Sequence, residues 1–192
     1  MRIENFSLLS GFISLAVSIS ALMINVGRSS DSTKEQDNTP ESTESGLNLL
    51  SSIEEVYLLG EEQVSENRVL SLMNTLEIEH PHIVLAQMRL ESGNFKSSLS
   101  QSNNNFFGMG HPQQRVTTSM GKNNGYATYK NWALSVLDYG LWQRRYARGL
   151  TEDEYYKMLG DKYAEDKDYV CKVKSIAGEI KMCSEILEYQ KN

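Results

Sequence analysis

Apolar positions recur at helical spacing through most of the chain from Ser65 onward. The first run predicts an amphipathic helix with one apolar face, made by Val69, Leu72, Met73 and Leu76. Pro81 suits the first turn of a second helix, which we expect to end at Glu91, just before Gly93. The same period returns over residues 132–148, 152–163 and 169–187, so the domain is predicted to be mainly helical.

One segment of the domain has a β-like pattern instead. Val116 to Thr118 and Tyr126 to Tyr129 are rich in β-branched and aromatic residues, and they flank the turn sequence Gly121 to Gly125. We therefore predict that these two stretches pair as a short hairpin across that turn. The expected fold class is a helical domain with one small β-hairpin lobe.

An uncharged apolar run, from Phe6 to Val26, lies near the start of the chain. It is long enough to cross a bilayer as a helix, and no clear small-residue cleavage site follows it. We therefore expect a signal anchor over residues 1–28, which contacts the membrane through residues 6–26. A cleaved signal peptide is the alternative. Basic residues on both sides of the run leave its orientation open.

A stretch rich in Ser, Thr, Glu, Asp and Asn follows, which is typical of a solvated tether. We expect a polar linker over residues 29–64 and the folded domain over residues 65–192. Within the linker, apolar residues between positions 48 and 59 predict a short helix. That helix would either pack on the domain or extend the stalk.

The net charge of −6 argues against a nucleic-acid partner, because no basic stripe is available to neutralise phosphates. Cys171 and Cys183 fall in one predicted helix, where twelve residues span about 18 Å. That distance is too long for a disulfide, so we interpret both as helix-packing residues. His80 and His82 flank a proline without a nearby partner in sequence, and we expect neither a metal site nor a cofactor.

Glu91 is the residue with the clearest candidate chemistry, since it ends an apolar helix directly before a Ser-Gly pair. This position could hold a carboxyl at the mouth of a cleft, half buried against its own helix. Burial raises a carboxyl pKa, and an acid that stays protonated near neutral pH can donate to a glycosidic oxygen. A solvated residue at a helix end has the same local sequence, so the short string alone does not decide between the two.

Four segments in order carry a family resemblance: AQMRLESG, KSSLSQSNNNFFGM, YATYKNWALSVLDY and YAEDKDYVCKV. Together they resemble the glucosaminidase domain of glycoside hydrolase family 73, to which flagellar peptidoglycan hydrolases and many bacterial autolysins belong. The resemblance covers roughly Glu79 to Val173. It implies a lysozyme-like fold, with a cleft between a helical lobe and a hairpin lobe. It also implies cleavage of the β-1,4 bond after N-acetylglucosamine in peptidoglycan strands.

The resemblance also assigns roles to individual residues. Glu91 matches the general acid, and Tyr129 matches a catalytic tyrosine that faces this acid. Residues matching the substrate-binding positions are Ser92, Asn105, Phe107, Gly108 and Tyr126. Of the two adjacent rings, Phe106 and Phe107, we expect one in the core and one against the ligand. Ser135 and Asp138 match structural helix positions, and we expect Asp138 at the surface or as a cap.

Glycosidases commonly use two carboxylates, yet no Asp or Glu occurs between Ser92 and Leu137. Two mechanisms remain. The acetamide of the substrate could act as nucleophile while Glu91 protonates the leaving oxygen, or Glu91 could act alone as in lytic transglycosylases. A glycan-binding domain without catalysis, in a cell-wall or phage assembly, is the alternative from another class.

An anchored enzyme should have its domain outside the cytoplasmic membrane, in the periplasm or cell envelope. A cleaved and secreted form is the alternative.

Overall fold

A computed structural model describes residues 53–162 and 166–189. Within this part the chain forms a helix over residues 53–61, followed by helices and strands in a mainly helical domain. These elements are α3 (Glu66–Thr75), α4 (Pro81–Glu91), α5 (Ser98–Asn103), β1 (Gly121–Asn123), β2 (Tyr126–Thr128), α6 (Trp132–Tyr146), α7 (Glu152–Lys162) and α8 (Tyr169–Tyr189). The helices predicted from apolar spacing are confirmed, and α5 is an additional one in the Asn-rich segment.

Local sequence explains where the helices begin. Pro81 occupies the first turn of α4, where its missing N–H costs nothing. The Asn131 side chain accepts a hydrogen bond from the Leu134 amide and caps α6. The Ser97 side chain accepts one from the Ser100 amide and caps α5. Ser97 is thus the local signal in the sequence that could have predicted α5.

The hairpin exists, but its predicted strand pairing is wrong. Gly121–Asn123 pairs with Tyr126–Thr128 around a two-residue turn, in which Asn124 and Gly125 have φ of 51° and 86°. Positive φ at both positions gives the turn whose twist matches paired strands. Thr118, predicted as part of the first strand, instead bonds α6: its amide donates to Asp138 and its hydroxyl to the Leu134 carbonyl.

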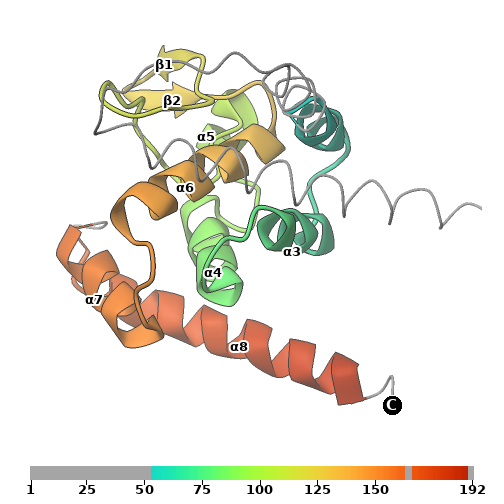
Figure 1. Cartoon of the computed structure of the whole chain (residues 1–192), viewed down its shortest axis with the longest axis vertical. Helices are drawn as coiled ribbons and strands as arrows, with labels where there is room; N and C mark the ends of the chain where they lie inside the picture. The colour runs from blue at the N-terminus through green and yellow to red at the C-terminus, as the bar shows by residue number, and fades with distance from the viewer. Residues whose placement is uncertain (1–52, 163–165, 190–192) are drawn as a thin grey trace, which may run out of the picture.

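Helix α4 runs through the middle of the domain. Its residues from Ile83 to Met88 are all buried, and it packs against both α3 and α8. Figure 1 shows β1 and β2 at one end of the domain and α8 at the other, with α4 and α6 between them. The C-terminal end of α4, which carries Glu91, is therefore set on a helix whose position is fixed from several sides.

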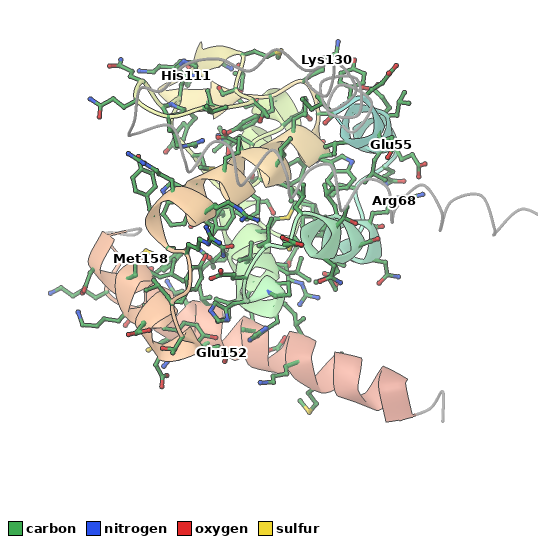
Figure 2. All side chains as sticks on the ribbon, viewed as in Figure 1. Glu55, Arg68, His111, Lys130, Glu152 and Met158 are labelled. Carbon is green, nitrogen blue, oxygen red and sulfur yellow. The ribbon has the colours of Figure 1, made fainter. Side chains whose placement is uncertain are left out.

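The helix over residues 53–61 packs on the domain and does not extend away from it. Val56 is fully buried, the Asn131 amide donates to the Tyr57 carbonyl, and the Trp132 indole N–H donates to the Glu62 carbonyl. In Figure 2, Glu55 on this helix and Lys130 just before α6 lie at the same end of the molecule. Of the two expectations for this stretch, packing on the domain is confirmed.

The expected membrane helix at residues 6–26 and most of the expected linker lie outside the described residues. Among the helices of the described part, none combines the length and the apolarity needed to cross a membrane. Cys171 and Cys183 are free thiols, and both are exposed on α8. The interpretation of these cysteines as helix-packing residues is therefore wrong.

Candidate active site

Glu91 lies in a cleft of about 780 Å³ at the C-terminal end of α4. Four parts of the fold meet there: the end of α4, the loop between α5 and β1, the second half of α6 and the start of α8. The described residues that line the cleft are Leu90, Glu91, Phe107, Gly108, Met109, Gly110, Pro112, Arg115, Trp142, Tyr146, Asp166, Tyr169 and Lys172. The strands of the hairpin contribute none of these lining residues, so the second wall is the loop and not the hairpin itself.

Two opposing effects set the acidity of Glu91. The carboxyl is partly buried, and this desolvation raises its pKa, while a hydrogen bond with Tyr169 lowers it. Desolvation is the larger effect, so the pKa of Glu91 lies above the ordinary value of a glutamate. A carboxylic acid in this state can keep its proton closer to neutral pH and donate it to a bound substrate.

Ser92 ends α4 and does not line the cleft in the described structure. It is fully buried; its hydroxyl donates to the Met88 carbonyl and accepts from the Phe95 amide. The chain then turns sharply through three left-handed residues, Gly93, Asn94 and Phe95, with φ of 55°, 54° and 68°. Ser92 thus holds the turn that stops the helix one residue after the acid.

The loop under the cleft is closed by the side chain of Asn105. Its amide donates to the carbonyls of Met109 and Ala127, and its oxygen accepts from the Met109 amide. These bonds tie both ends of the turn that presents Phe107 and Gly108 to the cleft. Asn105 is therefore a buried loop residue, and the backbone of β2 supports the same loop through Ala127.

Phe106 and Phe107 are both buried, with exposed fractions of 3% and 1%. Phe106 packs in the core near Phe95, and their ring centroids are 6.1 Å apart. Phe107 lines the cleft, but its ring is stacked on Tyr139 at 4.2 Å. The cleft-facing part of Phe107 therefore belongs to a ring that the core already holds in place.

Gly108→Ala is expected to lower both stability and activity. Gly108 has φ of +64°, which costs a residue with a Cβ about 1–2 kcal/mol. The new Cβ would also lie 3.2 Å from Glu91 Oε2, close enough to displace the carboxyl. Thermal unfolding and rates of glycan cleavage measure the two effects.

Gly110→Ala is the matched control, because Gly110 lines the same cleft. An added Cβ there would meet no atom of the described residues within 4 Å. Equal loss of activity in the two variants would contradict the importance of the Gly108–Glu91 contact.

The structure does not bring Tyr129 and Tyr126 to the cleft. Tyr129 is buried, and its hydroxyl donates to Asp138 Oδ2 at 2.8 Å. Burial, followed by the charge of Asp138, raises the Tyr129 pKa, so the phenol stays protonated. Tyr126 is 45% exposed on β2, and neither tyrosine is among the described residues that line the cleft.

The expectation that Asp138 lies at the surface or caps a helix is wrong. Asp138 is fully buried in α6 and forms a two-bond ion pair with Arg115, with N–O distances of 2.8 and 2.9 Å. Arg115 lines the cleft, so this ion pair fastens the cleft loop to α6. Tyr129 and the Thr118 amide complete the ligands of the Asp138 carboxylate. Ser135 donates to the Trp132 carbonyl, which confirms its structural role.

Several cleft residues were assigned no role from the sequence. Tyr169 and Asp166 lie within the quoted segment YAEDKDYVCKV, and Arg115 is the first charged residue after the Asn-rich loop. Trp142 and Tyr146 form an aromatic pair one turn apart on α6, and Tyr146 is 55% exposed. The spacing of the aromatic residues on α6 could have identified these two rings as cleft residues. Apolar periodicity alone assigned this face of the helix to the core.

The two histidines considered for a metal site are held by other groups. The His80 Nε2 atom lies 2.7 Å from the Leu150 carbonyl oxygen, and His82 lies 3.3 Å from Glu152. Within residues 53–162 and 166–189, the acidic, His and Cys side chains form no group that could hold a metal ion.

A partly buried acid at a helix end, in an open cleft walled by aromatic rings, is an arrangement suited to acid-catalysed cleavage of glycosidic bonds. A family model for glucosaminidases, described as mannosyl-glycoprotein endo-beta-N-acetylglucosaminidase, matches residues 67–182. Because this range is more than half of the 192 residues, the chain belongs to that glucosaminidase family and is a glycosidase. The resemblance stated from the sequence is therefore confirmed. No curated protein and no solved structure matched the chain.

Proposed function

We propose that the protein is an endo-β-N-acetylglucosaminidase that cleaves peptidoglycan strands, with Glu91 as the general acid. The observation that carries this proposal is the position of Glu91: a partly buried carboxyl with a raised pKa, inside the cleft and hydrogen-bonded to Tyr169. Family membership supports the glycosidase chemistry. The choice of peptidoglycan rests on the resemblance of the four sequence segments.

The proposed reaction uses the substrate's own acetamide as nucleophile. Its oxygen bonds to the anomeric carbon as the glycosidic C–O bond breaks, and the leaving oxygen takes the proton of Glu91. Water then attacks the anomeric carbon and gives its proton to Glu91, which restores the acid and the acetamide. One carboxyl is enough for both steps, because it acts first as acid and then as base.

A second carboxylate, Asp166, does line the cleft, but a cation holds it. Lys172 Nζ lies 2.6 Å from Asp166 Oδ2, and this hydrogen bond is the main reason that the Asp166 pKa is lowered. Asp166 is therefore ionised and exposed, and it lies in the segment just before α8. This arrangement favours a supporting role for Asp166 in the proposed mechanism over that of a nucleophile.

The aromatic wall and the buried ion pair fit the same proposal. Trp142 and Tyr146 offer ring faces on which sugar rings can stack. Tyr129, matched to a catalytic tyrosine by resemblance, is proposed to act indirectly, because its hydroxyl bonds the Asp138 that anchors Arg115 in the cleft.

Zymography on purified sacculi tests the function, with wild type beside Glu91→Gln. Mass spectrometry of the products distinguishes the mechanisms. A free reducing N-acetylglucosamine end supports hydrolysis, and an anhydro end would identify a lytic transglycosylase. Binding to sacculi without any product would identify a glycan-binding domain.

Cleavage is expected to fall at alkaline pH as Glu91 loses its proton. The Glu91 pKa is raised above its ordinary value of 4.5, so the active, protonated form persists to a higher pH than for an exposed glutamate. Initial rates of muropeptide release, measured over roughly pH 4 to 9, should show this alkaline limb. A rate that is already lost at the ordinary glutamate pKa would contradict the assigned role.

We further propose that residues 6–26 anchor the protein and that the domain lies outside the cytoplasmic membrane, where the glycan is. The apolar, uncharged sequence of this segment supports the anchor. Protease accessibility in intact spheroplasts tests the location, and a protected domain would contradict it.

A further inference from the structure

Behind Glu91, a series of buried side chains is joined by hydrogen bonds. Gln87 lies one turn before Glu91 on α4 and is fully buried. Its Nε2 donates to the Tyr169 hydroxyl at 3.2 Å, and its Oε1 accepts from the Tyr139 hydroxyl at 2.7 Å. Tyr169 in turn lines the same cleft as Glu91, and its interaction with that carboxyl lowers the Glu91 pKa. Gln87 and Glu91, four residues apart, therefore contact the same tyrosine of α8.

The backbone of Glu79 fixes the direction of these bonds. Its N–H can only donate, and it donates to Gln143 Oε1 at 2.8 Å. The Gln143 NH₂ group must then face the other way, and it donates to the Glu79 carbonyl at 2.9 Å and to the Tyr155 hydroxyl at 3.2 Å. Amide orientation, which is ordinarily assigned from the surrounding network, is thus determined here by a main-chain group.

The following bonds agree in the orientation that they give Gln87. Tyr155 accepts from Gln143, so its own proton is available for the Tyr139 hydroxyl, with which it is in contact, or for Gln87 Oε1 at 3.5 Å. Tyr139 donates to Gln87 Oε1, which therefore accepts, and the Gln87 NH₂ faces Tyr169. Tyr169 accepts that bond, so its own proton is available for the Glu91 carboxyl, which lines the same cleft.

We propose that Gln87 is a positioning residue, which acts through Tyr169 to hold the Glu91 carboxyl in the cleft and to supply it with a hydrogen-bond donor. Accepting an N–H makes a phenol a stronger donor in turn, because the hydrogen bonds of a chain polarise one another. The Gln87 bond lowers the pKa of Tyr169 accordingly, against the larger raising effect of burial. The proposal rests on the proposed function for its catalytic meaning, but not for the geometry.

The other charged residues among the described cleft residues each have an ion-pair partner. From α8 and the residues before it come Lys172 and Asp166, which pair with each other. From the loop comes Arg115, which pairs with Asp138. Two effects on the Glu91 pKa remain, namely burial and the interaction with Tyr169. The interaction with Tyr169 is the one that Gln87 can change.

The test is the titration of the Glu91 carboxyl in the full chain, followed by ¹³C NMR and assigned by its loss in Glu91→Gln. Gln87→Met removes the amide and is expected to raise the Glu91 midpoint by about half a pH unit or more. Tyr169→Phe removes the donor itself and should raise it further. Adding Gln87→Met to Tyr169→Phe should then change nothing, because the route from residue 87 is already cut.

Met88→Leu is the matched control, a change of apolar shape at the neighbouring buried position of α4. It should alter thermal stability without moving the midpoint. If Gln87→Met does not fold, Tyr139→Phe removes the bond to Gln87 Oε1 with almost no change in volume, and a smaller upward shift is expected. An unchanged midpoint in the folded variant, or a Gln87 effect that persists without the Tyr169 hydroxyl, overturns the proposal.

The two proposals fail in different ways. If the wild type cleaves no peptidoglycan, the proposed function fails, but the NMR titration still decides the role of Gln87. If the wild type cleaves, the alkaline limb of its pH profile should move upward in Gln87→Met by the same amount as the NMR midpoint.

Discussion

Glu91→Gln is expected to abolish peptidoglycan cleavage, with a loss of at least about a thousandfold, while binding to sacculi persists. General acid–base catalysis contributes about 10²- to 10⁴-fold, and here one carboxyl is assigned both the acid and the base step. Glutamine has nearly the same shape and can keep a hydrogen bond with Tyr169, so the cleft should remain intact. Muropeptide release measures the rate, and co-sedimentation with sacculi measures binding.

Asp166→Asn is the control for this variant, because it removes the other carboxylate among the described cleft residues. Substrate-assisted cleavage predicts a modest loss, since Asp166 is paired with Lys172. A loss as large as that of Glu91→Gln would indicate a two-carboxylate mechanism instead. Near-normal turnover by Glu91→Gln would remove the basis for the assignment of the acid.

Glu91→Gln is also expected to change the stability of the fold. Burial raises the folded-state pKa of Glu91, so the native state is disfavoured wherever this carboxyl is ionised, which is above that pKa. Glutamine cannot ionise. The stability gained by Glu91→Gln should therefore be present at neutral to alkaline pH and disappear as the pH falls below the glutamate pKa. Urea unfolding of both proteins, at neutral pH and at a pH below the glutamate pKa, measures this difference in stability.

Asp138→Ala is expected to destabilise the fold by about 3–5 kcal/mol, because it leaves the buried Arg115 without a counter-ion. The side chains of this pair are 7% and 0% exposed, so water cannot replace the carboxylate. Tyr129 and the Thr118 amide would lose their acceptor at the same time. Chemical denaturation measures the loss, and the melting temperature should fall by roughly 10 °C or more.

The control is Glu66→Gln, which breaks the pair of Glu66 with Arg89. Its side chains are 41% and 22% exposed, so solvent replaces much of the interaction, and the expected cost is below about 1 kcal/mol. Similar costs for the two variants would show that the Arg115–Asp138 pair does not anchor the cleft loop to α6.

Helix positions were predictable because their signals are local. Pro81 marks the start of α4, and the apolar spacing of α3 agrees with its buried residues Val69, Leu72 and Met73. The strands of the hairpin were less predictable. Val116 to Thr118 has a good strand composition, but Asp138, on a later helix, binds the Thr118 amide and removes that segment from the pairing.

The residues of the candidate site also divide into those whose position the sequence predicted and those whose position it did not. Glu91, Phe107 and Gly108 line the cleft as the resemblance implied, and all three lie within the two quoted segments around α4 and α5. Tyr129, by contrast, was matched by its place in a motif, and its hydroxyl is directed to Asp138. The direction of a side chain depends on what packs beside it, and no local pattern contains that information.

The sequence by itself determined the helical class and the helix ends near Pro81 and Glu91. These follow from apolar period, proline geometry and the Ser-Gly stop, which act over a few residues, whereas the role of Glu91 as an acid was implied by the family resemblance. Only the tertiary structure decided what surrounds that acid. Tyr169 lies 78 residues after Glu91 in the chain, and the packing of α8 on α4 brings both residues to one cleft. Burial and hydrogen-bond partners, which set the acidity of Glu91, arise from such distant contacts.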